Sequence, residues 1–153
     1  MIPPGNFFAE TYACIPGEPL MVNIVAIEDS RILCLNMLHL LTTCERSCPH
    51  HNKLIRNLLA ILAQKNLHLS RRSFHTAAKT IRARLLSYLS YEASRQGSLS
   101  FDIPFNRQQL ADYLNLDRSA LSNELSKMQK EQIIICHRNH FLLHTDSFDE
   151  MEF

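Results

Sequence analysis

The sequence predicts an α+β chain, with a β-rich N-terminal part, a long central helix and a small mixed domain at the C-terminus. In that domain, two short amphipathic helices joined by a polar turn occupy Asn106–Lys130 and precede two apolar runs. The central stretch Asn52–Arg72 contains no Gly or Pro, which favours a helix. Near the N-terminus, β-branched and other apolar residues gather in Val22–Ile27 and Ile32–Leu35, as is typical of strands.

The first of these stretches has the pattern of a helix-turn-helix. Asn106 can cap a first helix over Arg107–Leu114, because its side-chain oxygen accepts a free backbone N–H. Asn115 and Leu116 supply the turn, and Asp117 can cap a second helix that begins one residue later. The residues spaced to face the core are Leu110, Ala111 and Leu114 in the first helix, and Leu121, Leu125 and Met128 in the second.

The polar face of the second helix carries side chains suited to reading DNA. Arg can donate two hydrogen bonds to guanine, Asn can bond adenine, and Ser can bond either. A recognition helix contacts bases from its N-terminal end, which here holds Arg118, Ser119, Ser122 and Asn123. These four are the predicted base-reading residues. The alternative is an ordinary solvated helix face, which the same polar residues would satisfy.

Two apolar runs after this helix predict a β-hairpin, the wing of a winged helix-turn-helix. Ile133–Cys136 and Phe141–Leu143 flank a basic tip, in which Asn139 can adopt the positive φ of a tight turn. Alternating apolar residues over Leu99–Phe105 predict a further strand. The residues predicted to hold DNA phosphates are Arg107, Gln108, Lys127 and Arg138.

Three segments of this half match a known family in the same order. They are Ile81–Leu89 (IRARLLSYL), Phe101–Met128 and Arg138–Phe141 (RNHF). They resemble the Crp/Fnr superfamily of bacterial transcription regulators, which implies base reading by Arg118, Ser119 and Asn123. Family members usually have Glu and Arg at the second and third of these positions, so the resemblance implies a different operator. Gln132 stands where they usually have Gly between the recognition helix and the wing.

The residues before the predicted N-terminal hairpin extend the resemblance. Gly5, Phe8, Ala9 and Glu10 resemble the phosphate-binding loop that ends a cyclic-nucleotide-binding β-roll, with Ala9 in place of a glycine, and they are the predicted effector pocket. Family members pair the cyclic phosphate with an Arg, yet no basic residue lies between Glu10 and Arg31. Cyclic AMP is therefore not an expected ligand. The resemblance also implies a partial β-roll, shortened at its N-terminus; a naturally minimal sensor is the alternative.

The central helix carries two apolar stripes. Ile55, Leu62 and Leu69 form one, and Leu54, Leu58 and Ile61 form the other. A face this wide can contact both its own domain and a second copy of the chain. The resemblance implies a homodimer; a single buried helix in a monomer is the alternative. We expect a hinge at Ser73–Thr76, followed by a helix over Ala77–Arg95 that buries Ile81, Leu85 and Leu89.

One cluster of possible metal ligands lies just before the central helix. Cys44, Cys48 and His51 offer thiol and imidazole groups, which are ligands for zinc, iron or haem. A metal- or redox-sensing protein is therefore the alternative function. The other interpretation is ordinary thiols, because a structural four-coordinate site usually draws on two separated ligand pairs. Cys14, Cys34 and Cys136 lie in apolar or strand-like sequence and are interpreted as structural.

Composition and motifs exclude several classes of function. No apolar run could span a bilayer, no signal peptide opens the chain, and five cysteines without a secretory context indicate reduced thiols in the cytoplasm. No nucleophile motif or glycine-rich phosphate loop is present, so an enzyme is not expected. The predicted domains are a sensor over residues 1–48, a dimerisation helix and hinge over 49–75, and the DNA-binding domain over 76–153. The expected partners are double-stranded DNA and a second copy, with RNA polymerase as a further candidate.

Overall fold

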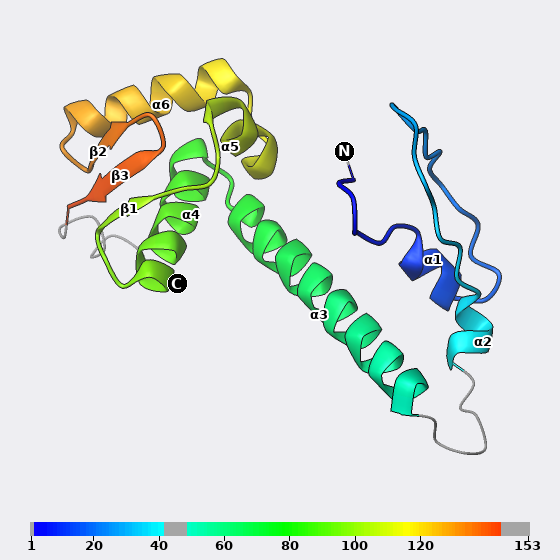
Figure 1. Cartoon of the computed structure of the whole chain (residues 1–153). Coiled ribbons are helices and arrows are strands. Elements are labelled where there is room, and N and C mark those ends of the chain that lie inside the picture. Colours follow the sequence, from blue (N-terminus) through cyan, green and yellow to red (C-terminus); the bar gives the residue numbers. More distant parts are fainter. Residues whose placement is uncertain (1, 42–48, 145–153) are drawn as a thin grey trace. The chain divides into compact units, whose positions relative to one another are not determined.

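The computed structural model describes residues 2–41 and 49–144, which divide into two compact units, Met1–Asn66 and Leu67–Phe153. The structure combines helices with one small antiparallel sheet, so the predicted α+β class is confirmed (Figure 1). Within the described part of the chain, none of the helices has the length and apolar character needed to cross a membrane.

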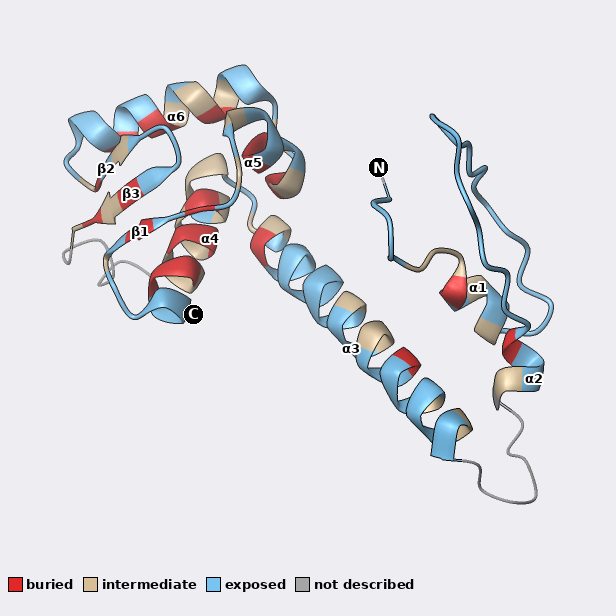
Figure 2. Ribbon diagram, viewed as in Figure 1, coloured by how far each residue is buried: buried red, intermediate tan, exposed pale blue. Residues whose placement is uncertain are grey.

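The second unit contains the predicted winged helix-turn-helix. Its helices are α4 (Ile81–Gln96), α5 (Arg107–Leu114) and α6 (Arg118–Lys130), and its strands are β1 (Ser100–Asp102), β2 (Ile134–His137) and β3 (His140–Leu143). The strands pair antiparallel in the order β1-β3-β2, so β3 is central and the β2–β3 hairpin forms the wing. Figure 2 shows the buried residues gathered where α4, α5, α6 and the sheet face one another.

The core of this unit contains most of the apolar residues that the periodicity predicted, together with Tyr88 and Ala93 of α4, whereas Ile81, predicted to be buried, is half-buried. Its buried members are Leu85, Tyr88, Leu89, Ala93, Phe101, Ile103, Leu110, Ala111, Leu114, Leu121, Leu125, Met128, Ile134, Phe141 and Leu143. Leu116, in the turn between α5 and α6, packs against them. The sheet has only three short strands, so the buried faces of the helices supply most of the core.

Helix α3 (Pro49–Ala77) is longer than the sequence predicted. The expected hinge at Ser73–Thr76 is wrong, because those residues continue the helix and the break follows at residues 78–80. Thr80 then caps α4, whose start lies four residues after the predicted one, by accepting a hydrogen bond from Ala83 N–H at 3.1 Å. No Gly or Pro interrupts the helix before Ala77, and the buried His75 holds its last turn against the core.

The first unit comprises α1 (Glu10–Cys14), α2 (Met37–Leu41) and the beginning of α3. The predicted strands Val22–Ile27 and Ile32–Leu35 are not formed, and no strand is present over residues 2–41. Figure 2 shows the connection between α1 and α2 as exposed throughout. A strand is stabilised by a hydrogen-bonded neighbour, and a single hairpin is marginal by itself. Within the described residues these apolar runs have no such neighbour, which explains the difference.

The two apolar stripes of α3 have different surroundings. Leu54, Leu58 and Ile61 line a cavity of about 150 Å³ together with residues of the N-terminal segment, and Leu58 is buried. In the other stripe, Ile55 and Leu62 are half-buried, and Leu69 is 62% exposed. Leu58 of the first stripe therefore packs within its own unit, whereas Leu54 of that stripe, 38% exposed, and Leu69 of the second stripe stay accessible.

Candidate nucleic-acid interface

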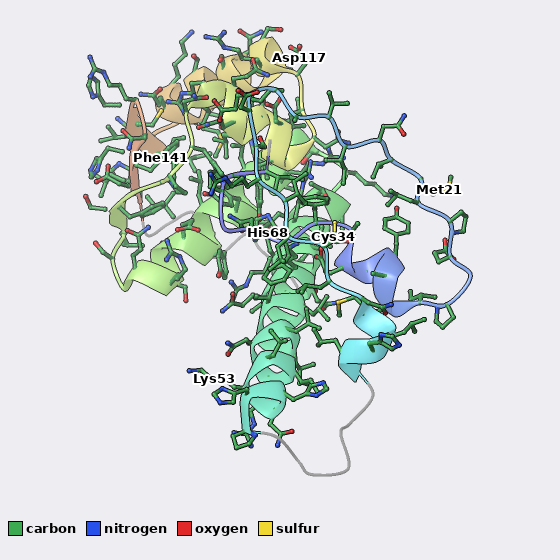
Figure 3. All side chains as sticks on the ribbon, turned by 45° about the vertical axis from the view of Figure 1, so that its right-hand side comes forward. Met21, Cys34, Lys53, His68, Asp117 and Phe141 are labelled. Atoms are coloured by element: carbon green, nitrogen blue, oxygen red, sulfur yellow. The ribbon has the colours of Figure 1, made fainter. Side chains whose placement is uncertain are left out.

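Side-chain caps fix the start of both helices of the helix-turn-helix. Asn106 and Gln109 form a reciprocal capping box at α5, in which each side chain accepts from the other residue's backbone N–H at 2.9 Å. Asp117 caps α6 by accepting from the backbone of Ser119 at 2.8 Å and of Ala120 at 3.0 Å. The two predicted caps are therefore confirmed. Figure 3 shows Asp117 at the turn that leads into α6.

The N-terminal end of α6 presents the predicted base-reading side chains to solvent. Arg118, Ser119 and Asn123 are exposed, while Ser122 is half-buried. Ser119 donates its hydroxyl hydrogen to Asp117, so its oxygen is left mainly as an acceptor. This hydroxyl, followed by the backbone N–H groups of Ala120 and Ser119, lowers the pKa of the Asp117 carboxyl. In the described structure, the Arg118 and Asn123 side chains carry no hydrogen bond, so their donors are available to a ligand.

The predicted phosphate-binding residues divide into two kinds. Lys127 is 66% exposed and lies 3.9 Å from Glu124 Oε2, and Arg138 is exposed at the tip of the wing. Gln108, also exposed, donates to Asp112 Oδ1 at 2.9 Å.

Arg107 belongs to the other kind, because it contacts the wing itself. Its guanidinium lies over the Phe141 ring, 5.2 Å from the ring centroid, and its Nη2 is 3.2 Å from Cys136 Sγ. Its Nη1 is buried and has no hydrogen-bond partner among the described atoms. Arg107 thus joins α5 to β2 and β3, a role that its position in the sequence did not predict.

The tip of the wing differs from the prediction in one residue. The two-residue turn between β2 and β3 consists of Arg138 and Asn139, and the positive φ of 54° belongs to Arg138. Asn139 instead accepts from Ile103 N–H through its backbone oxygen at 2.9 Å, and its side chain donates to Ile103 O at 3.4 Å. This contact with the chain beyond β1 holds Asn139 in place, so the preceding residue turns the backbone.

Two arginines of α4, which sequence analysis missed, bind the two helices of the helix-turn-helix. Arg82 bridges Glu124 Oε1 at 2.7 Å and Glu131 Oε2 at 2.7 Å, which ties α4 to α6 and to the residue that follows it. Arg84 donates to backbone carbonyls at the end of α5, among them Asn115 O at 3.2 Å. These partners lie far apart in the sequence, so no local spacing could have identified them.

Gln132, between α6 and the wing, adopts a φ of 60°. This backbone region favours glycine, because a Cβ atom crowds the following carbonyl oxygen there. Gln132 therefore replaces the glycine that is usual in the Crp/Fnr superfamily at a position where glycine is conformationally favoured.

The predicted effector-pocket residues lie at the start of α1. Gly5 and Ala9 both have positive φ, of 79° and 61°. Glu10 is buried and paired with Lys65 of α3, whose Nζ lies 2.5 Å from Glu10 Oε1 and 2.8 Å from Phe7 O. Burial raises the pKa of Glu10, but the Lys65 hydrogen bond, a backbone hydrogen bond and the Lys65 charge outweigh it and leave the pKa below its ordinary value.

This geometry bears on what the predicted pocket could bind. The cavity in this unit is lined by Phe7, Leu35, Met37, Leu40, Leu54, Asn57, Leu58 and Ile61, and so by none of the four predicted residues. Lys65 is a site residue that sequence analysis missed. It neutralises the one carboxylate of the predicted pocket from 55 positions further along the chain.

The predicted metal cluster is only partly within the described structure. Cys44 and Cys48 lie outside the described residues, and His51 is at the start of α3, with its Nε2 2.5 Å from Leu40 O. Among the residues that are described, no three His, Cys, Asp or Glu side chains gather as a metal site would require. Of the cysteines interpreted as structural, Cys14 and Cys136 are half-buried and Cys34 is exposed.

Comparisons with known proteins concern mainly the second unit. Residues 83–147 match the family model of the Crp-like helix-turn-helix domain. No curated protein matches the sequence. Eight chains of solved structures match, including that of a transcriptional regulator of the CRP family from Thermus thermophilus. The identity to that chain is 20% and the TM-score is 0.48, over 64% of this chain and 51% of that one. The match thus spans about half the length of the Thermus protein.

Proposed function

We propose that this chain, whose residues 83–147 match the Crp-like helix-turn-helix domain, is a DNA-binding regulator of the Crp/Fnr type that reads a specific double-stranded DNA sequence in the major groove as a homodimer. In this proposal, α6 lies in the groove, and Arg118, Ser119, Ser122 and Asn123 face the base edges. Lys127, Gln108 and Arg138 contact phosphates, a contribution that depends on salt rather than sequence. Arg107 assists by holding the wing.

One observation carries the base-reading proposal. The N-terminal end of α6 is capped by Asp117, while Leu121 behind it is fully buried, so the helix is held at both its end and its inner face. On the outer face, the side chains of Arg118 and Asn123 are exposed with their donors available. These are the residue types that bond guanine and adenine in pairs of hydrogen bonds. Base reading requires a helix that is held in place and whose N-terminal side chains have hydrogen-bond donors available for the bases.

The homodimer is supported by exposed leucines of α3. Leu69 is 62% exposed, and Leu59, which lies between Ile55 and Leu62 in the sequence, is 65% exposed. Apolar residues at this spacing are stabilised when a second helix covers them. Two reading heads related by a two-fold axis would then bind a palindromic operator, with half-sites about one helical turn apart.

We do not expect a response to cyclic AMP, because no basic residue lies between Glu10 and Arg31 and the Glu10 carboxylate is already paired with Lys65. We propose a regulatory rather than an enzymatic role, in the cytoplasm and acting with RNA polymerase.

Selection of bound molecules from a random duplex library tests this function. The expected result is a palindromic consensus with two equal half-sites, which requires both base reading and a dimer. A consensus with a single half-site would contradict the dimer. A folded protein that retains random duplexes without enriching any sequence would contradict the proposal.

A further inference from the structure

The C-terminal end of α5 is met by two arginines from two other helices. Arg72 of α3 donates from Nη2 to Asp112 O at 2.8 Å and from Nε to Tyr113 O at 2.9 Å. Arg84 of α4 donates from Nη1 to Leu114 O at 3.3 Å and to Asn115 O at 3.2 Å. Four successive carbonyl groups at this helix end therefore each receive a hydrogen bond from a guanidinium.

This arrangement has a specific physical consequence for the turn that follows. The last carbonyl groups of a helix lack partners within the helix, and they carry the negative end of its dipole. Two permanent positive charges placed there stabilise the helix end and restrict its direction. Asn115, with a φ of 54°, starts the turn, and Asp117 caps α6 two residues later. A constraint on the α5 end is thus transmitted over two residues to the base-reading end of α6.

The aromatic contacts of Tyr113 add to the attachment of α3 to α5. The Tyr113 ring lies 5.9 Å from the ring of His68 and 6.3 Å from the ring of His75, measured between centroids. Both histidines belong to α3, as does Arg72 between them. The last turns of α3 therefore contact the side chain and the backbone carbonyl of the same α5 residue.

We propose that Arg72 and Arg84 are positioning residues for base reading, which fix the turn between α5 and α6 by holding the last carbonyl groups of α5. The inference rests on the proposed function, because it assigns a role in the recognition of DNA. It also assigns that role to a residue of α3, a helix that lies outside the helix-turn-helix. Neither arginine needs to touch DNA to act in this way.

The test compares Arg72→Gln with Arg71→Gln. Both substitutions remove one positive charge from the same turn of α3, so both reduce non-specific attraction to phosphates similarly. Arg71 instead lies over the Tyr91 ring, 5.1 Å from its centroid, and provides the matched control. Amide hydrogen exchange of residues 115–123 reports the turn without DNA, and the affinity ratio between the selected duplex and a random duplex reports base reading.

The two variants are expected to differ in both readouts. Arg72→Gln should speed exchange in the turn and lower the selected-to-random affinity ratio about tenfold, the effect of losing one good base contact. Arg71→Gln should leave both unchanged, and Arg72→Lys, which keeps a charged donor, should recover part of the loss. Thermal unfolding of each variant sets a temperature at which all are folded.

Equal exchange in Arg72→Gln and Arg71→Gln would overturn the inference, as would an unchanged affinity ratio in Arg72→Gln. The proposed function fails differently. In that case the wild-type protein itself would enrich no duplex, and the exchange comparison would still decide whether Arg72 fixes the turn.

Discussion

Single residues with positive φ lie at the joints of the DNA-binding unit. Asn115 ends α5, Gln132 joins α6 to the wing, and Arg138 forms the tip of the wing. Asn adopts this conformation readily, whereas Gln and Arg carry a steric cost there. At Arg138, a charge at the tip of the wing offers a functional reason for a residue other than glycine. Nothing in the structure explains Gln132, which makes it a site where stability can be gained.

Replacing Gln132 with Gly should stabilise the protein. Removal of the Cβ atom relieves the backbone strain, partly offset by the greater entropy of glycine in the unfolded chain, for a net gain of about 0.5–1 kcal/mol. Chemical denaturation measures the free energy of unfolding. Gln132→Ala is the control, since alanine keeps the Cβ atom and should bring no such gain. A Gly variant no more stable than the Ala variant would contradict this explanation.

At the scale of elements, the helices that are fixed by neighbouring residues were predicted well, whereas structure that depends on residues distant in the sequence was not. The caps Asn106 and Asp117 act within three residues of themselves, so the sequence located α5 and α6 correctly. A hairpin over residues 22–35 is marginal unless further strands lie beside it, and its composition alone does not show whether such strands are present. The same limit explains why the contacts of Arg72 and Lys65 were missed, because their partners lie 40 and 55 positions away.

The joint between α3 and α4 should also respond to pH. His75 is 2% exposed, shares a hydrogen bond with Ser87 Oγ at 2.9 Å, and has a buried Nε2 without a partner in the described structure. Burial lowers its pKa; Glu92 opposes this effect and Arg71 adds to it. The remaining groups around the imidazole are the neutral rings of Phe74, Tyr88, Tyr91 and Tyr113.

A lowered pKa means that folding favours the neutral imidazole. The stability contributed by neutral His75 is complete above the ordinary pKa of 6.5 and is lost as the pH falls through the lower pKa of the folded state. The free energy of unfolding of the wild type should therefore decrease below pH 6.5. His75→Gln should show a smaller decrease over that range, whereas His68→Gln, at an exposed histidine of the same helix, should follow the wild type. Parallel pH profiles for the wild type and His75→Gln would rule out this role.

At the scale of the whole molecule, α3 contributes residues to both compact units, since the boundary between them falls at Asn66. Its exposed leucines are the main support for the proposed dimer. The helices and strands that form the DNA-binding unit give no comparable indication of a dimer. The net charge of +1 is too small to bring the chain to DNA by itself. Two reading heads on one operator would supply the affinity that one weakly charged head lacks.

The dimer can be tested at two exposed leucines of α3. Leu69 belongs to the stripe of Ile55 and Leu62, whereas Leu67, which is 48% exposed, lies two residues away and so points to a different side of the helix. Leu69→Glu should shift the protein from dimer to monomer in sedimentation velocity, because it places a charge in the seam between two helices. Leu67→Glu should leave the dimer intact. An equal response of the two variants, or none, would mean that this stripe is not the dimer interface.

The central claim is that the N-terminal end of α6 reads bases, and repeating the random duplex selection with Arg118→Ala tests it most directly. The variant should keep the half-site spacing but lose the preference at one position in each half-site, at a cost of about 1–3 kcal/mol for the wild-type operator. A consensus identical to that of the wild type, or a loss of affinity that is equal for operator and random DNA, would contradict the claim.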